Sequence, residues 1–397
     1  MGKDVAALAG RSAVLFLLDD RCRTGSETPL MLHRVMGVPL LKWLCQALWR
    51  AEVTRFFLAC DPALRAAAET CFPEKAELTA ASDENPSDRL HVFLSTAEER
   101  EEAVLVVTGP VIYAPCRREG REKTPANACV VSRQALMDAL DETAPIGRFL
   151  QSTGDPCTGE DGFFSVSAPE DLDRWQSVLA DDYLSVLRRA GVEIWDSRST
   201  WVEPGVEVGI GTVLLPGTVL QGRTVIGYGC TIGPNTRIID SKVGNHCEVE
   251  QSRLEQTRLA SGVQVGPFAN LRPGTVVEQR AKVGAFVELK NAELAQNVRV
   301  PHLSYLGDAS VGEETNVGCG VVTANFDRAK KHNTVIEPRA FIGCSTTLVA
   351  PVTVGEGAYV GAGTVVTEDI PAQALAIGRS KQQNKKEWAL RNKTEEE

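Results

Sequence analysis

Residues 208–238 read VGIGTV LLPGTV LQGRTV IGYGCT IGPNTR I, and this stretch decides the fold of the C-terminal half. An aliphatic residue opens every block of six, and glycine often follows it. These aliphatic residues are Val208, Leu214, Leu220, Ile226, Ile232 and Ile238. A period of six fits neither an α-helix nor an alternating strand. It predicts a parallel β-solenoid in which three blocks make one triangular coil, aliphatic side chains point inward and small residues occupy the corners.

The same pattern continues through most of the remaining chain, with occasional one-residue slips. Its later members are Val243, Val249, Val265, Leu271, Val277, Val283, Leu289, Leu294, Val300, Leu306, Val311, Val317, Ile336, Ile342, Leu348, Val354, Val360 and Val366. The segment from Thr323 to Asn333 interrupts it, so we expect this segment to project from the solenoid as a loop. Loops that interrupt a rigid scaffold commonly carry function.

The charge balance restricts the ligands that the protein can bind. Its 397 residues include 42 Lys and Arg against 52 Asp and Glu, so the formal charge is 42 − 52 = −10. This excludes a broadly basic nucleic-acid-binding protein, and an anionic ligand requires a local positive cluster.

No apolar run is long enough for a membrane helix, and Met1 to Arg11 lacks the apolar core of a secretory signal. The 11 cysteines show no Cys-x-x-Cys spacing, which is typical of reduced thiols. We expect a cytoplasmic protein that binds neither nucleic acid nor membrane.

The N-terminal half alternates apolar runs with helical patterns, which favours a parallel α/β sheet. We expect strands at 13–18, 56–59, 103–107 and 163–166, and helices at 39–51 and 64–70. A longer helix follows the Ser-x-x-Glu capping box of Ser167 and Glu170, and Gly191 is placed to end it. The predicted organisation is an α/β domain over 1–190 that ends in this linker helix, a β-helix over 200–380 and a tail over 381–397.

Several motifs in the repeat region occur in a fixed order. They are Val265-Gly-Pro-Phe-Ala-Asn-Leu-Arg-Pro-Gly274, Phe286-Val-Glu-Leu-Lys290, His302-Leu-Ser-Tyr-Leu-Gly-Asp308, Ala324-Asn-Phe-Asp327 and Leu348-Val-Ala-Pro-Val-Thr-Val-Gly355. Together they resemble the bacterial bifunctional N-acetylglucosamine-1-phosphate uridylyltransferase/glucosamine-1-phosphate N-acetyltransferase family, within the hexapeptide-repeat acyltransferases. The resemblance covers residues from about 205 to Arg379. It implies a left-handed β-helix, a hand that the period alone does not specify, and a homotrimer with active sites between subunits.

The resemblance also implies roles for individual residues in acetyl transfer from acetyl-CoA to glucosamine-1-phosphate. His302 matches the general base, a task that suits imidazole. The matches to sugar-phosphate ligands are Arg272, Lys290 and Lys331, and those to sugar contacts are Tyr305 and Asn316. The acetyl-CoA contacts map onto Asn325, Phe326, Cys344, the backbone of Ala362, and Arg379. Phe326 and Cys344 stand where the family usually has Tyr and Ser. Acetyl transfer needs no metal, and Cys344 is expected to line the site rather than act as a nucleophile.

The first half resembles a sugar-phosphate nucleotidyltransferase that has lost its chemistry. The loop from Asp19 to Gly25 has one glycine where the family has a glycine-rich phosphate loop, and Leu30 occupies the position of a lysine. The expected Gly-Asp metal motif reads Gly109-Pro110. Magnesium-assisted phosphoryl transfer should therefore be badly impaired, and we expect a pseudo-nucleotidyltransferase domain.

These features favour an acetyl-CoA:glucosamine-1-phosphate N-acetyltransferase that supplies UDP-N-acetylglucosamine and cell-wall precursors. One alternative is an N-acetyltransferase for a related amino sugar. Another is a non-catalytic assembly or regulatory protein, which the changes at Phe326 and Cys344 and the depleted first half would fit. For the C-terminal tail, packing of Trp388 on a neighbouring subunit and a solvated end remain equally open.

Overall fold

The computed structural model describes residues 11–17, 20–21, 25, 27–81, 86–97, 101–114, 125–141 and 146–388. The chain divides into two compact units, Met1–Leu179 and Ala180–Glu397, which are described separately below. No helix among the described residues is long and apolar enough to cross a membrane. Most of the loop from Asp19 to Gly25 and the end of the tail lie outside the described residues.

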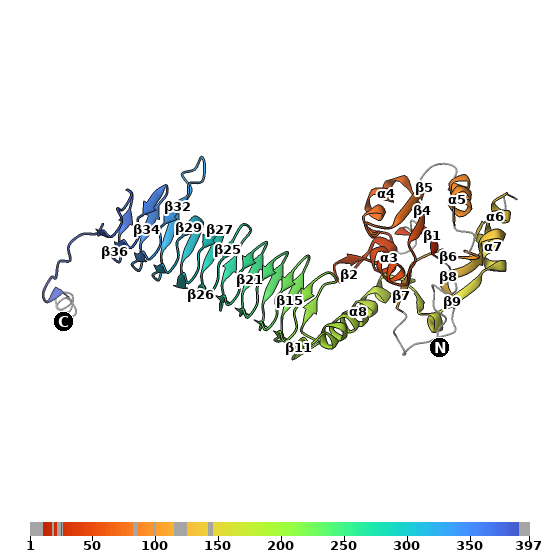
Figure 1. Cartoon of the computed structure of the whole chain (residues 1–397), viewed down its shortest axis with the longest axis horizontal. Coiled ribbons are helices and arrows are strands. Elements are labelled where there is room, and N and C mark those ends of the chain that lie inside the picture. The colour runs from red at the N-terminus through yellow and green to blue at the C-terminus, as the bar shows by residue number, and fades with distance from the viewer. Residues whose placement is uncertain are drawn as a thin grey trace, which may run out of the picture. The chain divides into compact units, whose positions relative to one another are not determined.

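The first unit is an α/β domain built on a six-stranded sheet (Figure 1). Its strands, in sheet order, are β5 (Glu77–Ala81), β4 (Arg55–Cys60), β1 (Ser12–Leu17), β6 (Ala103–Val107), β8 (Pro125–Ser132) and β9 (Asp155–Thr158). The first four run parallel, whereas β8 is antiparallel to both β6 and β9. The predicted parallel sheet is thus confirmed, with the strands expected at 13–18, 56–59 and 103–107 present as β1, β4 and β6. Strand β5, which was not predicted, extends one edge in parallel, and the antiparallel strands β8 and β9 extend the other.

One predicted strand lies outside this sheet. β10 (Phe163–Ser165) pairs antiparallel with β7 (Val111–Tyr113) in a separate two-stranded sheet, so placing 163–166 in the parallel sheet was wrong. Phe163 is buried because its ring packs on Tyr113, with 4.6 Å between centroids. An apolar run of residues predicts a buried strand, but it does not predict which strand pairs with it. A second small sheet joins β2 (Arg34–Val35) to β3 (Val38–Pro39).

Short helices accompany the sheet. They are η1 (Leu30–Leu32), α3 (Leu40–Arg50), α4 (Pro62–Glu69), α5 (Pro86–Ser95), α6 (Arg133–Asp141), α7 (Ile146–Thr153) and η2 (Gly159–Asp161). The predicted helices at 39–51 and 64–70 correspond to α3 and α4. α4 begins two residues earlier than expected because Asp61 caps it, accepting a 2.7 Å hydrogen bond from the backbone of Ala63.

Helix α8 (Pro169–Arg189) is capped as predicted by Gly191, which follows its last turn and adopts φ +87°. The N–H of Val192 reaches back to the carbonyl of Leu187 at 3.1 Å, completing a Schellman motif. The predicted capping acid was wrong by one residue. Asp171, rather than Glu170, accepts from the backbone N–H groups that precede the helix, because a helix starting at Pro169 places Asp171 at its third position.

The second unit is a left-handed parallel β-helix whose short strands stack coil on coil (Figure 1). One sheet contains β11 (Glu193–Ile194), β14 (Val213–Leu214), β17 (Thr231–Ile232), β20 (Glu248–Val249), β23 (Gln264–Val265), β26 (Lys282–Ala285), β28 (Arg299–His302), β30 (Asn316–Val317), β33 (Phe341–Ile342), β36 (Tyr359–Val360) and β38 (Leu375–Ala376). We call it the 11-stranded sheet.

A second, 17-stranded sheet forms the rest of the wall. It contains β12 (Trp201–Val202), β13 (Glu207–Val208), β15 (Val219–Gln221), β16 (Val225–Ile226), β18 (Arg237–Ile239), β19 (Lys242–Val243), β21 (Arg253–Glu255), β22 (Arg258–Leu259), β24 (Asn270–Leu271), β25 (Val276–Val277), β27 (Glu288–Leu294), β29 (Tyr305–Val311), β31 (Val322–Ala324), β32 (Thr334–Ile336), β34 (Thr347–Val349), β35 (Val352–Val354) and β37 (Val365–Val366). β27 and β29 are long enough to pass around a corner of the coil, and they pair along most of their length.

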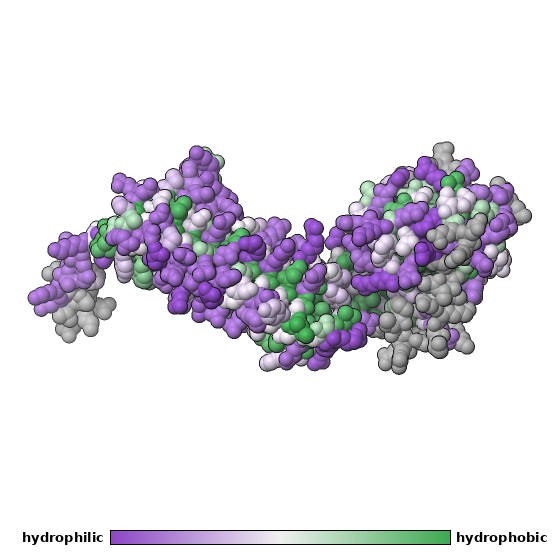
Figure 2. Space-filling view, in the orientation of Figure 1, coloured by the Kyte–Doolittle hydropathy of each residue, from purple (hydrophilic) through white to green (hydrophobic). Residues whose placement is uncertain are grey.

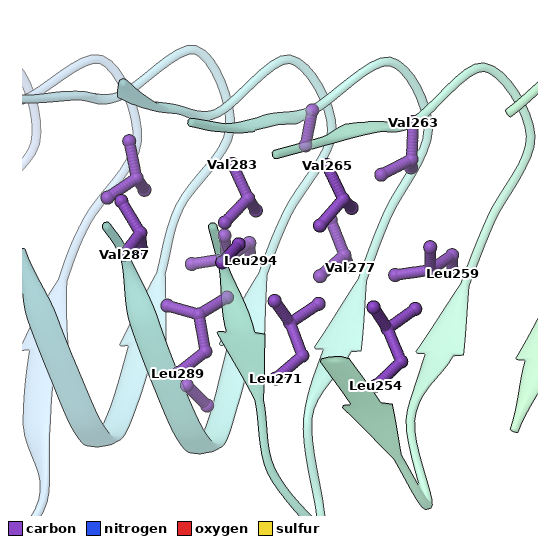
Figure 3. Close-up of a cluster of buried hydrophobic side chains, with 14 of the residues drawn as sticks. Leu254, Leu259, Val263, Val265, Leu271, Val277, Val283, Val287, Leu289 and Leu294 are labelled. Atoms are coloured by element: carbon purple, nitrogen blue, oxygen red, sulfur yellow. The ribbon is translucent and has the colours of Figure 1, made fainter. Parts of the chain in front are cut away.

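The aliphatic residues of the six-residue pattern form one continuous core (Figure 3). All of the predicted members are at most 4% exposed except Val208, which is partly buried. The core has no gap between Val249 and Val265, where no member was predicted. Leu254 and Leu259 fill it at 0% and 2% exposure, because two coil faces there are five residues long instead of six. Each buried Leu or Val contributes about 1.5–3 kcal/mol of burial free energy.

The predicted projecting loop is present between β31 and β32, where Figure 1 shows it rising from the coils and Figure 2 shows that its visible surface is mostly hydrophilic. It begins later than predicted, at Asn325. Thr323 still belongs to β31 and is buried, and its hydroxyl accepts a 2.8 Å hydrogen bond from the backbone N–H of Gly307. We refer to residues 325–333 as the 325–333 loop.

Candidate functional site

Three positive side chains converge on the 17-stranded sheet beside the base of the 325–333 loop. Lys290 lies in β27, Arg272 follows β24, and Lys331 lies in the loop. The ammonium of Lys331 beside Lys290 lowers the pKa of Lys290, and Arg272 adds to this shift. The guanidinium of Arg272 is held by a 2.9 Å hydrogen bond to Glu288. We call Arg272, Lys290 and Lys331 the cation cluster. Like charges gathered in this way favour binding of an anion.

A buried carboxylate next to the cluster orders two amides. Asp308 is 7% exposed, and its Oδ1 accepts a 2.7 Å hydrogen bond from Asn291. Its Oδ2 accepts a hydrogen bond from the amide of Asn325, which is 8% exposed. Asn325 was predicted as a site residue, but the role of Asp308 was missed because it depends on side chains from three successive coils.

Tyr305 lies at the start of β29 with its hydroxyl over the backbone of Gly307. A Cβ atom at Gly307 would clash with that hydroxyl and lie 2.8 Å from the amide nitrogen of Asn325. Glycine is therefore required for Tyr305 and Asn325 to lie next to each other. The structure thus brings together Arg272, Lys290, Lys331, Tyr305 and Asn325 as a single group.

His302 and Asn316 do not belong to this group within one chain. Both lie in the 11-stranded sheet, His302 at the exposed end of β28 and Asn316 in the neighbouring strand β30. His302 is one coil corner before Tyr305, and its carbonyl accepts a 2.9 Å hydrogen bond from Ser304. Among the described residues, no hydrogen bond or ion pair joins His302 or Asn316 to the cation cluster.

Three of the other predicted acetyl-CoA contacts, Cys344, Ala362 and Arg379, form a row down one corner of successive coils. The N–H of Gly363 donates a 2.8 Å hydrogen bond to the carbonyl of Cys344, and a Cβ atom at Gly343 would lie 2.6 Å from the nitrogen of Ala362. The side chain of Arg379 passes beside Gly363. Cys344 is an exposed free thiol. The last contact, Phe326, lies apart from this row in the 325–333 loop and is 62% exposed.

The 325–333 loop contains an acid–imidazole pair that was not predicted as part of the site. Nε2 of His332 lies 2.7 Å from Oδ2 of Asp327. Oδ1 of Asp327 accepts 2.8 Å hydrogen bonds from the backbone N–H groups of Ala329 and Lys330. The N–H of Lys330, the contact with His332 and the N–H of Ala329 together hold the pKa of Asp327 well below its usual range. The Asp-x-x-x-x-His spacing was the available sequence signal.

In the first unit, the positions predicted to have lost nucleotide chemistry are filled by apolar or backbone contacts. Leu30 is fully buried, and its N–H donates a 3.0 Å hydrogen bond to Asp20. The carbonyl of Pro110 accepts a 2.9 Å hydrogen bond from the amide of Asn127. Among the described residues, no three His, Cys, Asp or Glu side chains gather in a way that could hold a metal ion.

Comparison with known proteins identifies relatives. Residues 333–368 match the family model described as bacterial transferase hexapeptide (six repeats). A 203-residue alignment, 51% of this chain and 44% of the relative, is 49% identical to the bifunctional protein GlmU of Caldicellulosiruptor saccharolyticus. The corresponding protein of Carboxydothermus hydrogenoformans is 50% identical over 202 residues, 51% of this chain and 45% of the relative. The chain therefore spans about half the length of the curated relatives it matches.

Among solved structures, the polysialic-acid-specific acetyltransferase NeuO aligns with a TM-score of 0.23 at 14% identity, covering 51% of this chain and 93% of NeuO. The UDP-N-acetylglucosamine acyltransferase of Arabidopsis aligns with a TM-score of 0.26 at 14% identity, covering 49% of this chain and 68% of that protein. The sequence relatives share far more identity than these structures. About half of the chain is therefore similar in sequence to the bifunctional GlmU proteins, and residues 333–368 match the bacterial transferase hexapeptide model.

Proposed function

We propose that this protein transfers the acetyl group of acetyl-CoA to the amine of glucosamine-1-phosphate. The observation that carries the proposal is the cation cluster of Arg272, Lys290 and Lys331, set into a chain of formal charge −10. Arginine offers a planar fork to phosphate oxygens, and lysine adds a point charge. A sugar phosphate bound there would lie beside Tyr305, the proposed sugar contact.

In the proposed mechanism, His302 acts as general base. Imidazole removes a proton from the substrate ammonium, and the free amine attacks the thioester carbonyl. A C–N bond forms, the C–S bond breaks, and the thiolate of coenzyme A leaves and takes up a proton. Because acetyl passes directly from sulfur to nitrogen, Cys344 serves as a lining residue and needs no covalent intermediate.

We propose that the working enzyme is a homotrimer with sites between subunits. His302 and Asn316 lie in a different sheet from the cation cluster of the same chain. A site that uses all of these residues is therefore more readily completed at the junction of two copies. The family resemblance supports the same arrangement.

Acetyl-CoA is the proposed co-substrate, and no metal takes part in the transfer. Asn325 and Phe326 would contact it from the loop, and Cys344, the backbone of Ala362 and Arg379 from the corner row. The chemistry of these groups fits the ligand, since Arg379 can pair with a phosphate and Phe326 offers an exposed apolar ring. Phe326 lacks the hydroxyl of the usual tyrosine, which affects affinity more than reaction type.

We further propose that the first unit no longer performs uridylyl transfer. Buried Leu30 cannot supply the positive charge of a phosphate-binding lysine, and Pro110 cannot supply a metal-binding carboxylate. The product, N-acetylglucosamine-1-phosphate, would then require a separate uridylyltransferase before it enters UDP-N-acetylglucosamine and cell-wall precursor synthesis. The cytoplasm is the proposed location.

Two assays on one preparation of the full chain test the proposal. The first follows N-acetylglucosamine-1-phosphate formation from acetyl-CoA and a panel of amino-sugar phosphates. The second follows UDP-N-acetylglucosamine formation from UTP and N-acetylglucosamine-1-phosphate. We expect activity in the first, with glucosamine-1-phosphate preferred, and none in the second. Preference for another amino sugar would change the acceptor, and failure to bind acetyl-CoA would favour a non-catalytic role.

A further inference from the structure

The cation cluster contains an unfavourable contact that the proposed chemistry does not explain. The ammonium groups of Lys290 and Lys331 lie side by side, and their like charges repel. Lys290 is fixed in strand β27, whereas Lys331 lies in the 325–333 loop. A lysine on a free loop would move away from its neighbour when no anion is bound. Something in the loop must therefore hold Lys331 in place.

Asp327 closes this loop on itself. Its Oδ1 accepts from the N–H groups of Ala329 and Lys330, both at 2.8 Å, so it caps the tip as in an Asx-turn. Its Oδ2 lies 2.7 Å from Nε2 of His332. One carboxylate thus ties together the residues on both sides of Lys331.

The base of the loop is tied independently. The N–H of His332 donates a 2.8 Å hydrogen bond to the carbonyl of Asn325, and Phe326 and Lys331 form an antiparallel bridge. Asn325 is itself held by buried Asp308. The backbone at Lys331 is therefore held by contacts on both sides. The His332 side chain is largely shielded at 20% exposure, which strengthens its pairing with Asp327.

We propose that Asp327 and His332 are positioning residues that hold Lys331 against Lys290 and so preorganise the phosphate site. This inference rests on the proposed function, because it assigns the pair to the sugar-phosphate half of that site. Phosphate then binds to a cluster whose loop is already ordered, and binding is not weakened by the entropy of ordering the loop. Neither residue touches the substrate in this scheme, since both act through Lys331.

The test is a double-mutant cycle between Asp327→Ala and Lys331→Ala, read by calorimetric binding of glucosamine-1-phosphate to the full chain. Asp327→Ala should weaken binding about tenfold in the wild-type background, a loss typical of one charged hydrogen bond. It should have little further effect once Lys331 is alanine, because the pair acts through that side chain. An undiminished loss in the Lys331→Ala background would overturn the proposal.

Two further variants separate positioning from folding. Asp327→Asn retains an oxygen for the backbone N–H groups and should recover much of the affinity. Arg258→Gln, which breaks a 2.9 Å ion pair with Glu278 on the same sheet, is the matched control and should leave binding unchanged. In steady-state kinetics, Asp327→Ala and His332→Ala should raise KM for the sugar phosphate far more than they lower kcat. A fall in kcat with an unchanged KM for the sugar phosphate would contradict a positioning role.

Inorganic phosphate serves as a second probe that does not depend on the reaction. If the wild-type protein binds phosphate but transfers no acetyl group, the proposed function fails. The double-mutant cycle between Asp327→Ala and Lys331→Ala, measured with inorganic phosphate, then still tests whether Asp327 positions Lys331. If acetyl transfer is present and Asp327→Ala binds both ligands as tightly as wild type, the pair has no positioning role and only this inference fails.

Discussion

Lys290 and Lys331 meet from separate elements, one in strand β27 and the other in the 325–333 loop, and the charge of Lys331 lowers the pKa of Lys290. Two ammonium groups remain together because the loop is tied by its own hydrogen bonds. The contact costs the free protein some electrostatic energy, which a bound phosphate would recover.

This contact predicts a pH dependence. Phosphate favours the charged form of Lys290, so affinity should fall as the pH rises through the pKa of Lys290, and this fall should begin below the pH expected for an ordinary lysine. Lys331→Ala should weaken binding but move the fall to higher pH. Calorimetric titrations with inorganic phosphate between neutral and alkaline pH measure both effects. Lys242→Ala, at an exposed lysine of strand β19, is the control and should change neither.

His302→Ala should lower kcat for acetyl transfer by about 10²–10⁴-fold, the usual contribution of a general base. Because His302 is exposed, its loss should leave the fold and the oligomeric state intact, as measured by light scattering. His246→Asn is the matched control. The His246 ring packs on Tyr228, and its backbone has φ +54°, a conformation that asparagine tolerates. The His246→Asn variant should therefore keep the wild-type kcat. A His302→Ala variant of normal activity would remove this residue from catalysis.

Gly307→Ala should weaken substrate binding without unfolding the coil. Its new Cβ would push aside the hydroxyl of Tyr305 and crowd the amide of Asn325. If displacement of Tyr305 is the cause, Gly307→Ala should add little to Tyr305→Ala in the double variant. Affinities for glucosamine-1-phosphate across the four proteins check this, and fully additive losses would show that the two residues act separately.

Leu254→Ala should lower the free energy of unfolding by about 2–5 kcal/mol, because this fully buried side chain leaves a cavity between stacked coils. Val365→Ala, at a position 53% exposed, should change it by less than about 0.5 kcal/mol. Denaturant unfolding of both variants compares them directly. Equal effects would mean that the aliphatic core does not dominate stability.

The β-helix could be predicted from the sequence because its coil geometry imposes the aliphatic spacing on every turn. The same rule missed Leu254 and Leu259, where the coil face shortens to five residues, since a strict period of six passes over them. Strand β10 was placed in the wrong sheet because burial of Phe163 does not reveal its neighbour.

The three residues of the cation cluster were each predicted as sugar-phosphate ligands, but the groups that organise the cluster were not predicted. Asp308 holds side chains from the coils before and after its own, and Asp327 holds a loop whose path the sequence does not specify. His332 lies outside the motifs that carry the family resemblance. Contacts of this kind form when coils stack on one another or when a loop closes, and they leave no periodic pattern in the sequence.

The most direct test of the central claim measures release of free thiol from acetyl-CoA with glucosamine-1-phosphate and with glucosamine as alternative acceptors. If the cation cluster binds the acceptor through its phosphate, kcat/KM should be higher for glucosamine-1-phosphate by about 10² or more, and Lys290→Ala should remove most of that preference. Equal rates with the two acceptors, or no thiol release with either, would contradict the account.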